Sequence, residues 1–165
     1  MKKDYETFYR NITSWFRKKK NRTTFLILAN RILTYLFYVS YPVLLIWIFI
    51  NDRTFFLRAL LIPAVTFCLL SFVRQKINRP RPYDKWNIDP LIHKDTKGKS
   101  MPSRHLFSSA VISMVFLHVS PWAGIIALIL SALDGILRVI GGVHYPTDVC
   151  MGFLCGCLAG GFLWL

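Results

Sequence analysis

The sequence predicts an all-α integral membrane protein, a helical bundle of about five transmembrane helices with an N-terminal amphipathic interfacial helix. Two observations carry this prediction. The 165-residue chain is 54% hydrophobic with a mean hydropathy of +0.41, and its charged residues, 18% of the total, leave long uncharged runs between them. Such runs are typical of a membrane protein. Too little polar sequence remains to cover them in a water-soluble core, and the same apolarity argues against a nucleic-acid-binding domain despite the net charge of +13.

Five apolar runs are candidate membrane spans, because about 20 apolar residues cross the hydrocarbon core as a helix. They are Thr24–Ile50, Phe55–Val73, Ser103–Val119, Trp122–Ile140 and Val149–Leu165. The first run is too short for two crossings and a turn, so it is interpreted as one tilted span with a candidate kink at Pro42. The long polar segment Arg74–Met101 is expected to be a loop with at most one short helix.

The N-terminal residues form a separate segment, 1–22, ahead of a membrane-embedded domain at 23–165. Its polar part is too long for a cleavable signal peptide. Apolar side chains recur in it at helical spacing, at Tyr5, Phe8, Tyr9, Ile12, Trp15 and Phe16. Lys and Arg occupy much of the rest, so we expect an amphipathic helix lying on an anionic lipid surface.

The basic residues predict an orientation. Nine Lys or Arg occur up to Arg31, and nine more lie between Arg74 and Arg104. Five spans place these two groups on the same side of the membrane, which the positive-inside rule makes cytoplasmic. We therefore expect a multi-pass protein of a bacterial cell membrane.

The cysteines are expected to be packing residues. Cys68, Cys150, Cys155 and Cys157 all lie in or beside apolar spans, and the last three neighbour the glycines of the final span. Their spacing spreads them around a helix, so no metal site is expected at them. No cofactor is expected for the protein.

Three polar groups lie at span ends on one predicted membrane face, at Arg74–Pro82, Pro102–His105 and Arg138–Asp148. Alone, each is typical of a basic loop or a helix cap; together they predict a pocket for a phosphate monoester or a diphosphate. Guanidinium groups bind phosphate oxygens bidentately and stabilise charge in the transition state. The candidate phosphate-binding residues are Arg74, Lys76, Arg81, Ser103, Arg104 and Arg138.

Two histidines indicate covalent catalysis. His144 precedes Asp148 by four residues at a helix start, a spacing that can set the carboxylate against the ring, so His144 is the candidate nucleophile. His105 has no carboxylate partner within a helical turn and lies among arginines, so it is the candidate acid. Asp134 is spaced to pair with Arg138 in the fourth span. The other two histidines are expected to be interfacial (His118) and solvent-exposed (His93).

These groups resemble the three-part signature of the type 2 phosphatidic acid phosphatase superfamily, which combines Lys-x6-Arg-Pro, Pro-Ser-Gly-His and Ser-Arg-x5-His-x3-Asp. The resemblance covers about Phe55–Leu165. It implies a metal-independent lipid phosphatase that works through a phosphohistidine, with His144 as nucleophile, Asp148 as its partner and His105 as acid. It also implies that Arg81, Arg138, Ser103 and the residue at the first motif position hold the phosphate.

The sequence departs from that signature at three positions. Arg74 replaces the Lys of the first motif, and Lys76 is a competitor for that role. Arg104 replaces the Gly of the second motif, and Leu137 replaces the first Ser of the third motif. A fourth difference is topological. Family members commonly have six spans and an outward-facing site, so either one N-terminal span is absent and the site faces inward, or the orientation rule fails here.

We therefore predict a membrane lipid phosphatase acting on phosphatidylglycerophosphate or phosphatidic acid. One alternative is an undecaprenyl diphosphate phosphatase, and an alternative of another class is a non-catalytic membrane protein that binds anionic lipid. A haloperoxidase that shares the superfamily pocket is disfavoured, because those proteins are soluble and larger. The expected partners are the lipid substrate and an anionic lipid surface, with no nucleic acid; the sequence leaves the oligomeric state open.

Overall fold

The computed structural model describes residues 2–165, and side chains from Tyr5 onward; Met1, part of the predicted segment 1–22, lies outside the described residues. Across this range the chain forms helices and no strands, which confirms the predicted all-α class. The helices are α1 Lys2–Arg17, α2 Lys20–Asn51, α3 Arg53–Ile77, α4 Pro82–Lys85, α5 Arg104–Val119, α6 Pro121–Ile140 and α7 Pro146–Gly161, and a 3₁₀ turn at Phe162–Trp164 follows. The short α4 is the helix expected within the long polar loop.

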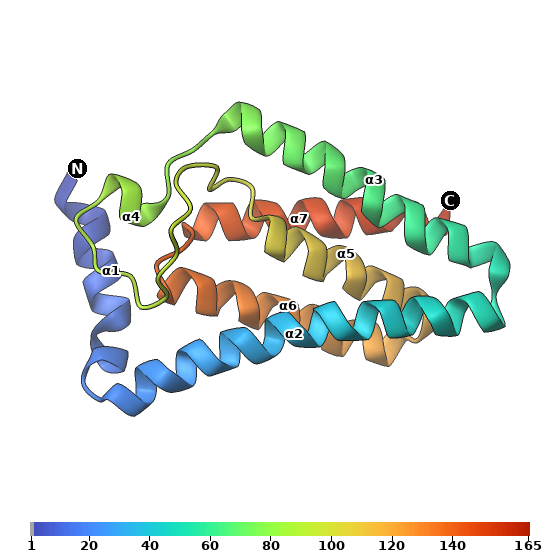
Figure 1. Ribbon diagram of the computed structural model, residues 1–165, viewed down its shortest axis with the longest axis horizontal. Coiled ribbons are helices and arrows are strands. Elements are labelled where there is room, and N and C mark those ends of the chain that lie inside the picture. The colour runs from blue at the N-terminus through green and yellow to red at the C-terminus, as the bar shows by residue number, and fades with distance from the viewer. Residues whose placement is uncertain (1) are drawn as a thin grey trace.

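Helices α2, α3, α5, α6 and α7 run along the long axis of the molecule, and α1 lies across one end beside α4 (Figure 1). Four of them, α2, α3, α6 and α7 with its 3₁₀ extension, are long and apolar enough to cross a membrane. The fifth, α5, is apolar but has only 16 residues. The C-terminus lies at the end opposite α1 (Figure 1), as expected for an odd number of crossings.

Helix α5 can be short because it lies in the centre of the bundle. Half of its residues are buried, and it contacts α2, α3, α6 and α7. Glycines of α7 allow a close approach to α5: a Cβ at Gly156 would lie 2.6 Å from the Phe107 carbonyl oxygen, and one at Gly152 would lie 2.4 Å from the Ser103 carbonyl oxygen. Small residues at such contacts let membrane helices pack backbone to backbone. Cys155 packs against the buried cluster that includes Phe107 and Ala159, whereas Cys68 and Cys150 are exposed, so the packing role expected for the cysteines is seen at Cys155 and not at those two.

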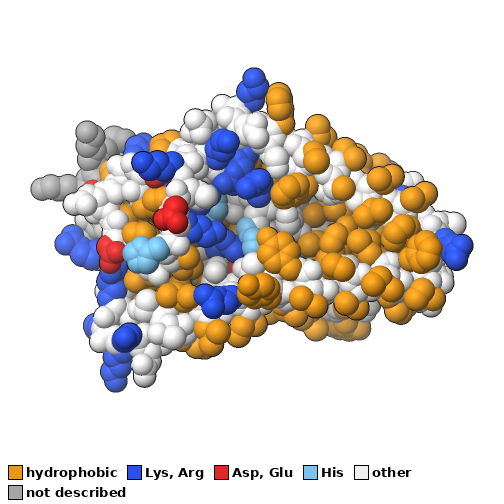
Figure 2. All heavy atoms as spheres, viewed as in Figure 1, with side chains coloured by type: hydrophobic (Ala, Val, Ile, Leu, Met, Phe, Trp, Pro, Cys, Tyr) orange, Lys and Arg blue, Asp and Glu red, His pale blue; other side chains and the backbone are white. Residues whose placement is uncertain are grey.

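The outer face of the bundle is apolar. Ile50 and Leu158 are each 72% exposed, and many other large apolar side chains of α2, α3, α6 and α7 share this exposure. Figure 2 shows these side chains covering the helical part, whereas Lys and Arg gather at the end that holds α1 and the long loop. This distribution fits helices surrounded by lipid with a polar end at the membrane surface.

The predicted amphipathic helix α1 buries part of its aromatic face against protein. Tyr9 is 2% exposed; its hydroxyl donates to the Ile140 carbonyl and accepts from the backbone N–H of Leu91, both over 3.2 Å. The ring of Tyr5 stacks on Trp86. Phe8 and Trp15 remain exposed. Helix α1 therefore fixes the long loop in place and keeps a second, outward apolar edge available for lipid.

Candidate active site

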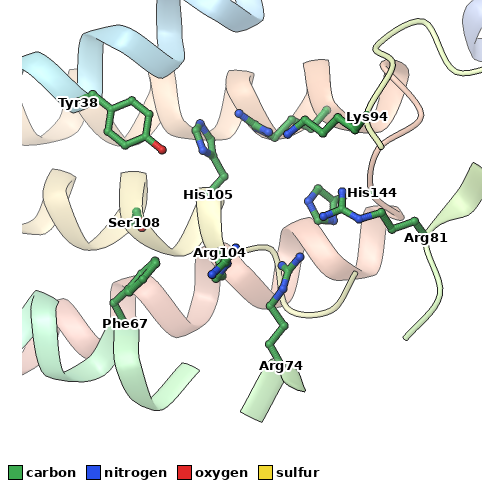
Figure 3. Close-up of a pocket in the computed structure, with 10 residues that line it drawn as sticks. Tyr38, Phe67, Arg74, Arg81, Lys94, Arg104, His105, Ser108 and His144 are labelled. Carbon is green, nitrogen blue, oxygen red and sulfur yellow. The ribbon is translucent and has the colours of Figure 1, made fainter. Parts of the chain in front are cut away.

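A polar cavity of about 290 Å³ opens at the end of the bundle that carries the long loop. Its walls come from α2, α3, α5, α6 and two loops, so all three predicted polar groups contribute to it (Figure 3). The residues that line it are Tyr38, Phe67, Arg74, Arg81, Lys94, Arg104, His105, Ser108, Arg138 and His144. Five of these ten are Lys or Arg, so the cavity is suited to an anion.

His144 lies against the predicted carboxylate. Pro146 begins α7, and Oδ2 of Asp148 accepts from the Tyr145 backbone N–H over 3.0 Å, which fixes the carboxylate in the first turn. Nδ1 of His144 is 3.6 Å from the same oxygen. Ser100 joins the two, with Oγ 2.5 Å from Asp148 Oδ2 and 3.3 Å from His144 Nδ1. Because Nδ1 faces this pair, Nε2 is the ring nitrogen left for a substrate.

Burial also sets the charge of His144. The side chain is 4% exposed, and this burial lowers the pKa of His144 to about 4, although the contact with Asp148 opposes the shift. The nearby Arg81 lowers the pKa further. The imidazole is therefore neutral near pH 7, the form that can attack phosphorus.

Arg79 is a site residue that the sequence analysis did not single out. Its Nη1 donates to Asp148 Oδ1 over 2.7 Å, and its guanidinium stacks on the Tyr145 ring at 4.1 Å. It does not line the cavity. Arg79 therefore holds the carboxylate from behind, while Asp148 holds the histidine.

The second histidine has a carboxylate partner from another helix. Nε2 of His105, in α5, is 3.2 Å from Oδ2 of Asp134, in α6. The same oxygen accepts from Nε of Arg138 over 3.1 Å, as the spacing within α6 predicts. Thr34 of α2 completes the cluster, since its Oγ1 is 3.1 Å from both His105 Nε2 and Arg138 Nη2. The Asp134 carboxylate favours the charged form of the His105 ring, in the opposite direction to the burial of the same side chain.

Three cavity arginines are buried and anchored to the protein. Nη1 of Arg74 donates to the Pro102 carbonyl over 2.7 Å, and Arg81 donates to the carbonyls of Gly98 (3.2 Å) and Val143 (3.3 Å). Arg138 is held by Asp134. Their remaining N–H groups are thereby preorganised toward the cavity, which is the arrangement that stabilises developing charge at little reorganisation cost.

Two other cations in the cavity are not anchored. Within the described part of the chain, neither Lys94 nor Arg104 has a hydrogen bond or an ion-pair partner, and both side chains are exposed. Partial burial in the cavity mouth, together with Arg138 and Arg81, lowers the pKa of Lys94 to about 8. The sequence did not predict Lys94 as a site residue, because it lies in a loop without helical or strand periodicity and outside the three polar groups.

Two predicted phosphate ligands do not line the cavity. Lys76 is exposed on the outside of α3, with Nζ 5.4 Å from the Phe72 ring centroid; two residues along a helix turn the side chain about 200° away from Arg74. Of the two candidates for the first motif position, Arg74 therefore lines the cavity and Lys76 lies outside it. Ser103 is fully buried, its hydroxyl has no partner among the described residues, and its backbone N–H donates to the Asp148 carbonyl over 2.9 Å.

The remaining histidines lie away from the cavity. His118, near the other end of the bundle, stacks on Phe55 with ring centroids 3.8 Å apart. His93 is exposed on the long loop, as expected.

An apolar groove of about 350 Å³ adjoins the cavity between α2, α3 and α5. Tyr38, Phe67 and Ser108 line both the cavity and the groove. Further residues of the groove are Phe37, Tyr41, Pro42, Leu60, Pro63, Ala64, Val111 and Ile112. A molecule with a phosphate at one end and a hydrocarbon chain at the other could therefore occupy both at once.

Comparison with known proteins identifies the family. The model of the PAP2 superfamily matches residues 55–165, two thirds of the chain and all three polar groups. The chain belongs to the PAP2 superfamily. The curated proteins include no match to the sequence.

Two solved structures share the fold. The crystal structure of Aquifex aeolicus LpxE has a TM-score of 0.75 and 24% identity, covering 96% of this chain and 93% of that one. A transmembrane PAP2-type phosphatidylglycerolphosphate phosphatase from Bacillus subtilis has a TM-score of 0.63 and 22% identity, covering 96% of this chain and 91% of that one. The similarity thus includes α1 and α2, which lie outside the family match.

Proposed function

We propose that the protein is a membrane lipid phosphatase that hydrolyses a phosphate monoester or diphosphate lipid through a phosphohistidine on His144. The observation that carries this proposal is the pairing of two histidines in one cationic cavity. His144 faces Asp148 and is buried in its neutral form, whereas His105 faces Asp134. Membership of the PAP2 superfamily supports this proposal, as does the activity of one structural relative, a phosphatidylglycerolphosphate phosphatase.

The reaction follows from these positions. Nε2 of His144 attacks phosphorus, the bond from phosphorus to the leaving oxygen breaks, and that oxygen takes a proton from His105. Asp148 stabilises the imidazolium that forms on His144. Water then attacks the phosphohistidine and gives its proton to His105, which releases inorganic phosphate and restores neutral His144. Arg74, Arg81 and Arg138 stabilise the phosphoryl oxygens throughout.

The apolar groove explains why the substrate would be a lipid. The phosphate would enter the cavity while the hydrocarbon chain stays between α2 and α3, so the substrate need not leave the bilayer. Phosphatidylglycerophosphate and phosphatidic acid are the leading candidates, and undecaprenyl diphosphate is the alternative.

The test is phosphate release by the purified protein in detergent micelles from these three lipids, with a chelator present. We expect release that vanadate inhibits, and transfer of ³²P from labelled lipid to a base-stable, acid-labile site on the protein. His144→Ala should abolish both the label and release. A protein that only binds anionic lipid would release nothing, and full activity of His144→Ala would contradict the mechanism.

The basic N-terminus supports a cytoplasmic cavity in a bacterial cell membrane. A single cysteine introduced at Lys97, in a background without native cysteines, would be labelled by an impermeant maleimide from one side only. Labelling of inside-out but not right-side-out vesicles is expected; the reverse result would place the cavity outside.

A further inference from the structure

We infer that Arg104 binds a second phosphate, carried by the leaving group of the substrate, so that the site prefers lipids with two phosphates to phosphatidic acid. This inference rests on the proposed lipid phosphatase function and adds the class of substrate. It begins with the difference between the anchored and the unanchored cations of the cavity.

The charge of the cavity exceeds what one phosphate can neutralise. Five cationic side chains line it, and Asp134 is the carboxylate that pairs with one of them, Arg138. Asp148 is engaged by Arg79 from outside the cavity. Four positive charges thus face a ligand. A phosphate monoester carries about −1.5 to −2 near neutral pH, which leaves roughly half of that charge unmatched.

The unmatched charge includes Arg104. Arg74, Arg81 and Arg138 are buried and fixed by protein acceptors, as a site for the transferred phosphoryl group requires. Arg104 is exposed and has neither a hydrogen bond nor an ion pair to any described residue; its guanidinium lies 5.8 Å from the Phe67 ring centroid. A guanidinium held only by an aromatic ring keeps all of its N–H donors for a ligand.

Arg104 lies where the leaving group of the substrate would be. It precedes His105, the acid that protonates the leaving oxygen, at the start of α5. Figure 3 shows Arg104 and His105 between His144 on one side and Tyr38, Phe67 and Ser108 on the other. The latter three line the apolar groove as well. A leaving group that carries the hydrocarbon chain must pass Arg104 on its way from the reacting phosphorus to the groove.

Two kinds of lipid place a phosphate there. In a lipid diphosphate the leaving group is the lipid monophosphate, and in phosphatidylglycerophosphate it is an alcohol whose glycerol also bears a phosphodiester. In either case, water is consumed and one inorganic phosphate is released, while Arg104 binds the phosphate that stays on the lipid. The leaving group of phosphatidic acid is uncharged diacylglycerol, which carries no phosphate for Arg104 to bind.

The test compares kcat/KM of the purified full chain for three lipids, namely phosphatidic acid, phosphatidylglycerophosphate and a prenyl diphosphate. The variants are Arg104→Gln, which removes the charge, Arg104→Lys, which keeps it, and Lys97→Gln, which removes an exposed cation of the loop outside the cavity. Thermal unfolding of each variant in detergent controls for folding.

We expect Arg104→Gln to lower the ratio of kcat/KM for a two-phosphate lipid to that for phosphatidic acid by about 10-fold or more, the size of a charged hydrogen bond. Arg104→Lys should retain most of the ratio, and Lys97→Gln should not change it. The lipid whose ratio falls identifies the source of the second phosphate.

Three results would overturn the inference. An unchanged ratio in Arg104→Gln, or a wild-type protein that prefers phosphatidic acid to both other lipids, would do so while the proposed lipid phosphatase function stands. No release from any lipid by folded wild-type protein would remove the proposed function and this inference together.

Discussion

Nη1 of Arg79 lies 2.7 Å from Oδ1 of Asp148, on the side of the carboxylate opposite the oxygen that faces His144. Asp148 thus has one oxygen for a cation outside the cavity and one for the histidine inside it. Ser100 and the Tyr145 backbone N–H also donate to the inner oxygen. The orientation of His144 therefore depends on residues from the long loop as well as on the helix that carries Asp148.

Removing Arg79 should weaken catalysis more than folding. In Arg79→Gln, Asp148 loses a partly exposed ion pair, so we expect kcat to fall by about 10- to 100-fold, which is the range for a charged hydrogen bond. The unfolding temperature in detergent should change little. Lys99→Gln is the control, because Lys99 is an exposed loop cation whose side chain has no hydrogen bond or ion pair in the described chain. Equal activity of the two variants would exclude this role for Arg79.

His144 should stay neutral well below the usual range of a histidine. Burial lowers its pKa to about 4, so protonation is disfavoured in the folded state, and the protein loses stability as the pH falls below about 6.5 toward 4. ¹⁵N-histidine NMR in micelles, with the signal assigned by comparison with His144→Gln, should show a neutral ring at pH 6. A ring that is charged at pH 6 would contradict the proposed resting state of the nucleophile.

Asp134 should be needed for both function and stability. Asp134→Asn leaves the buried Arg138 without a charge partner, which costs about 3–5 kcal/mol, and it removes the carboxylate beside His105. Phosphate release should fall by at least about 100-fold. Asp95→Asn, at an exposed position, is the control. The double variant Asp134→Asn/Arg138→Met should recover part of the unfolding temperature but no activity; recovery of both would place the pair outside catalysis.

Helix packing can be tested with two glycines of α7. A Cβ at Gly156 would lie 2.6 Å from the Phe107 carbonyl oxygen and 2.7 Å from the Ala110 Cβ, whereas one at Gly161 meets nothing within 4 Å. Gly156→Ala should therefore destabilise the protein by about 1–3 kcal/mol. Gly161→Ala makes the same chemical change without the clash and should be neutral. Thermal unfolding in detergent measures both, and equal unfolding temperatures would contradict the packing of α5 on α7.

Contacts around the cavity were predictable from the sequence where the spacing along the chain fixes their geometry. The four-residue step from Asp134 to Arg138 lies within one turn of α6, and the step from His144 to Asp148 runs from the loop into the first turn of α7, so both contacts followed from the chain order. The sequence left Lys76 as a competitor of Arg74, but two residues along a helix point about 200° apart, and Arg74 is the one that lines the cavity.

Contacts between residues of different helices or loops could not be predicted from spacing along the chain. His105 meets Asp134 through the packing of α5 on α6, and Ser100 and Lys94 reach the site from a loop without periodicity. Helix α1 illustrates a related limit. Its pattern predicted that one face is buried, but could not tell whether lipid or protein covers it, and Tyr9 is covered by protein.

The shared wall of the polar cavity and the apolar groove has a consequence for how this protein would meet its substrate. Tyr38 and Phe67 border both spaces, and the groove lies between helices whose outer faces are apolar. Encounters then take place by diffusion within the plane of the membrane. Initial rates should follow the mole fraction of substrate in the bilayer, and diluting the substrate with inert lipid should slow the reaction even when its bulk concentration is constant.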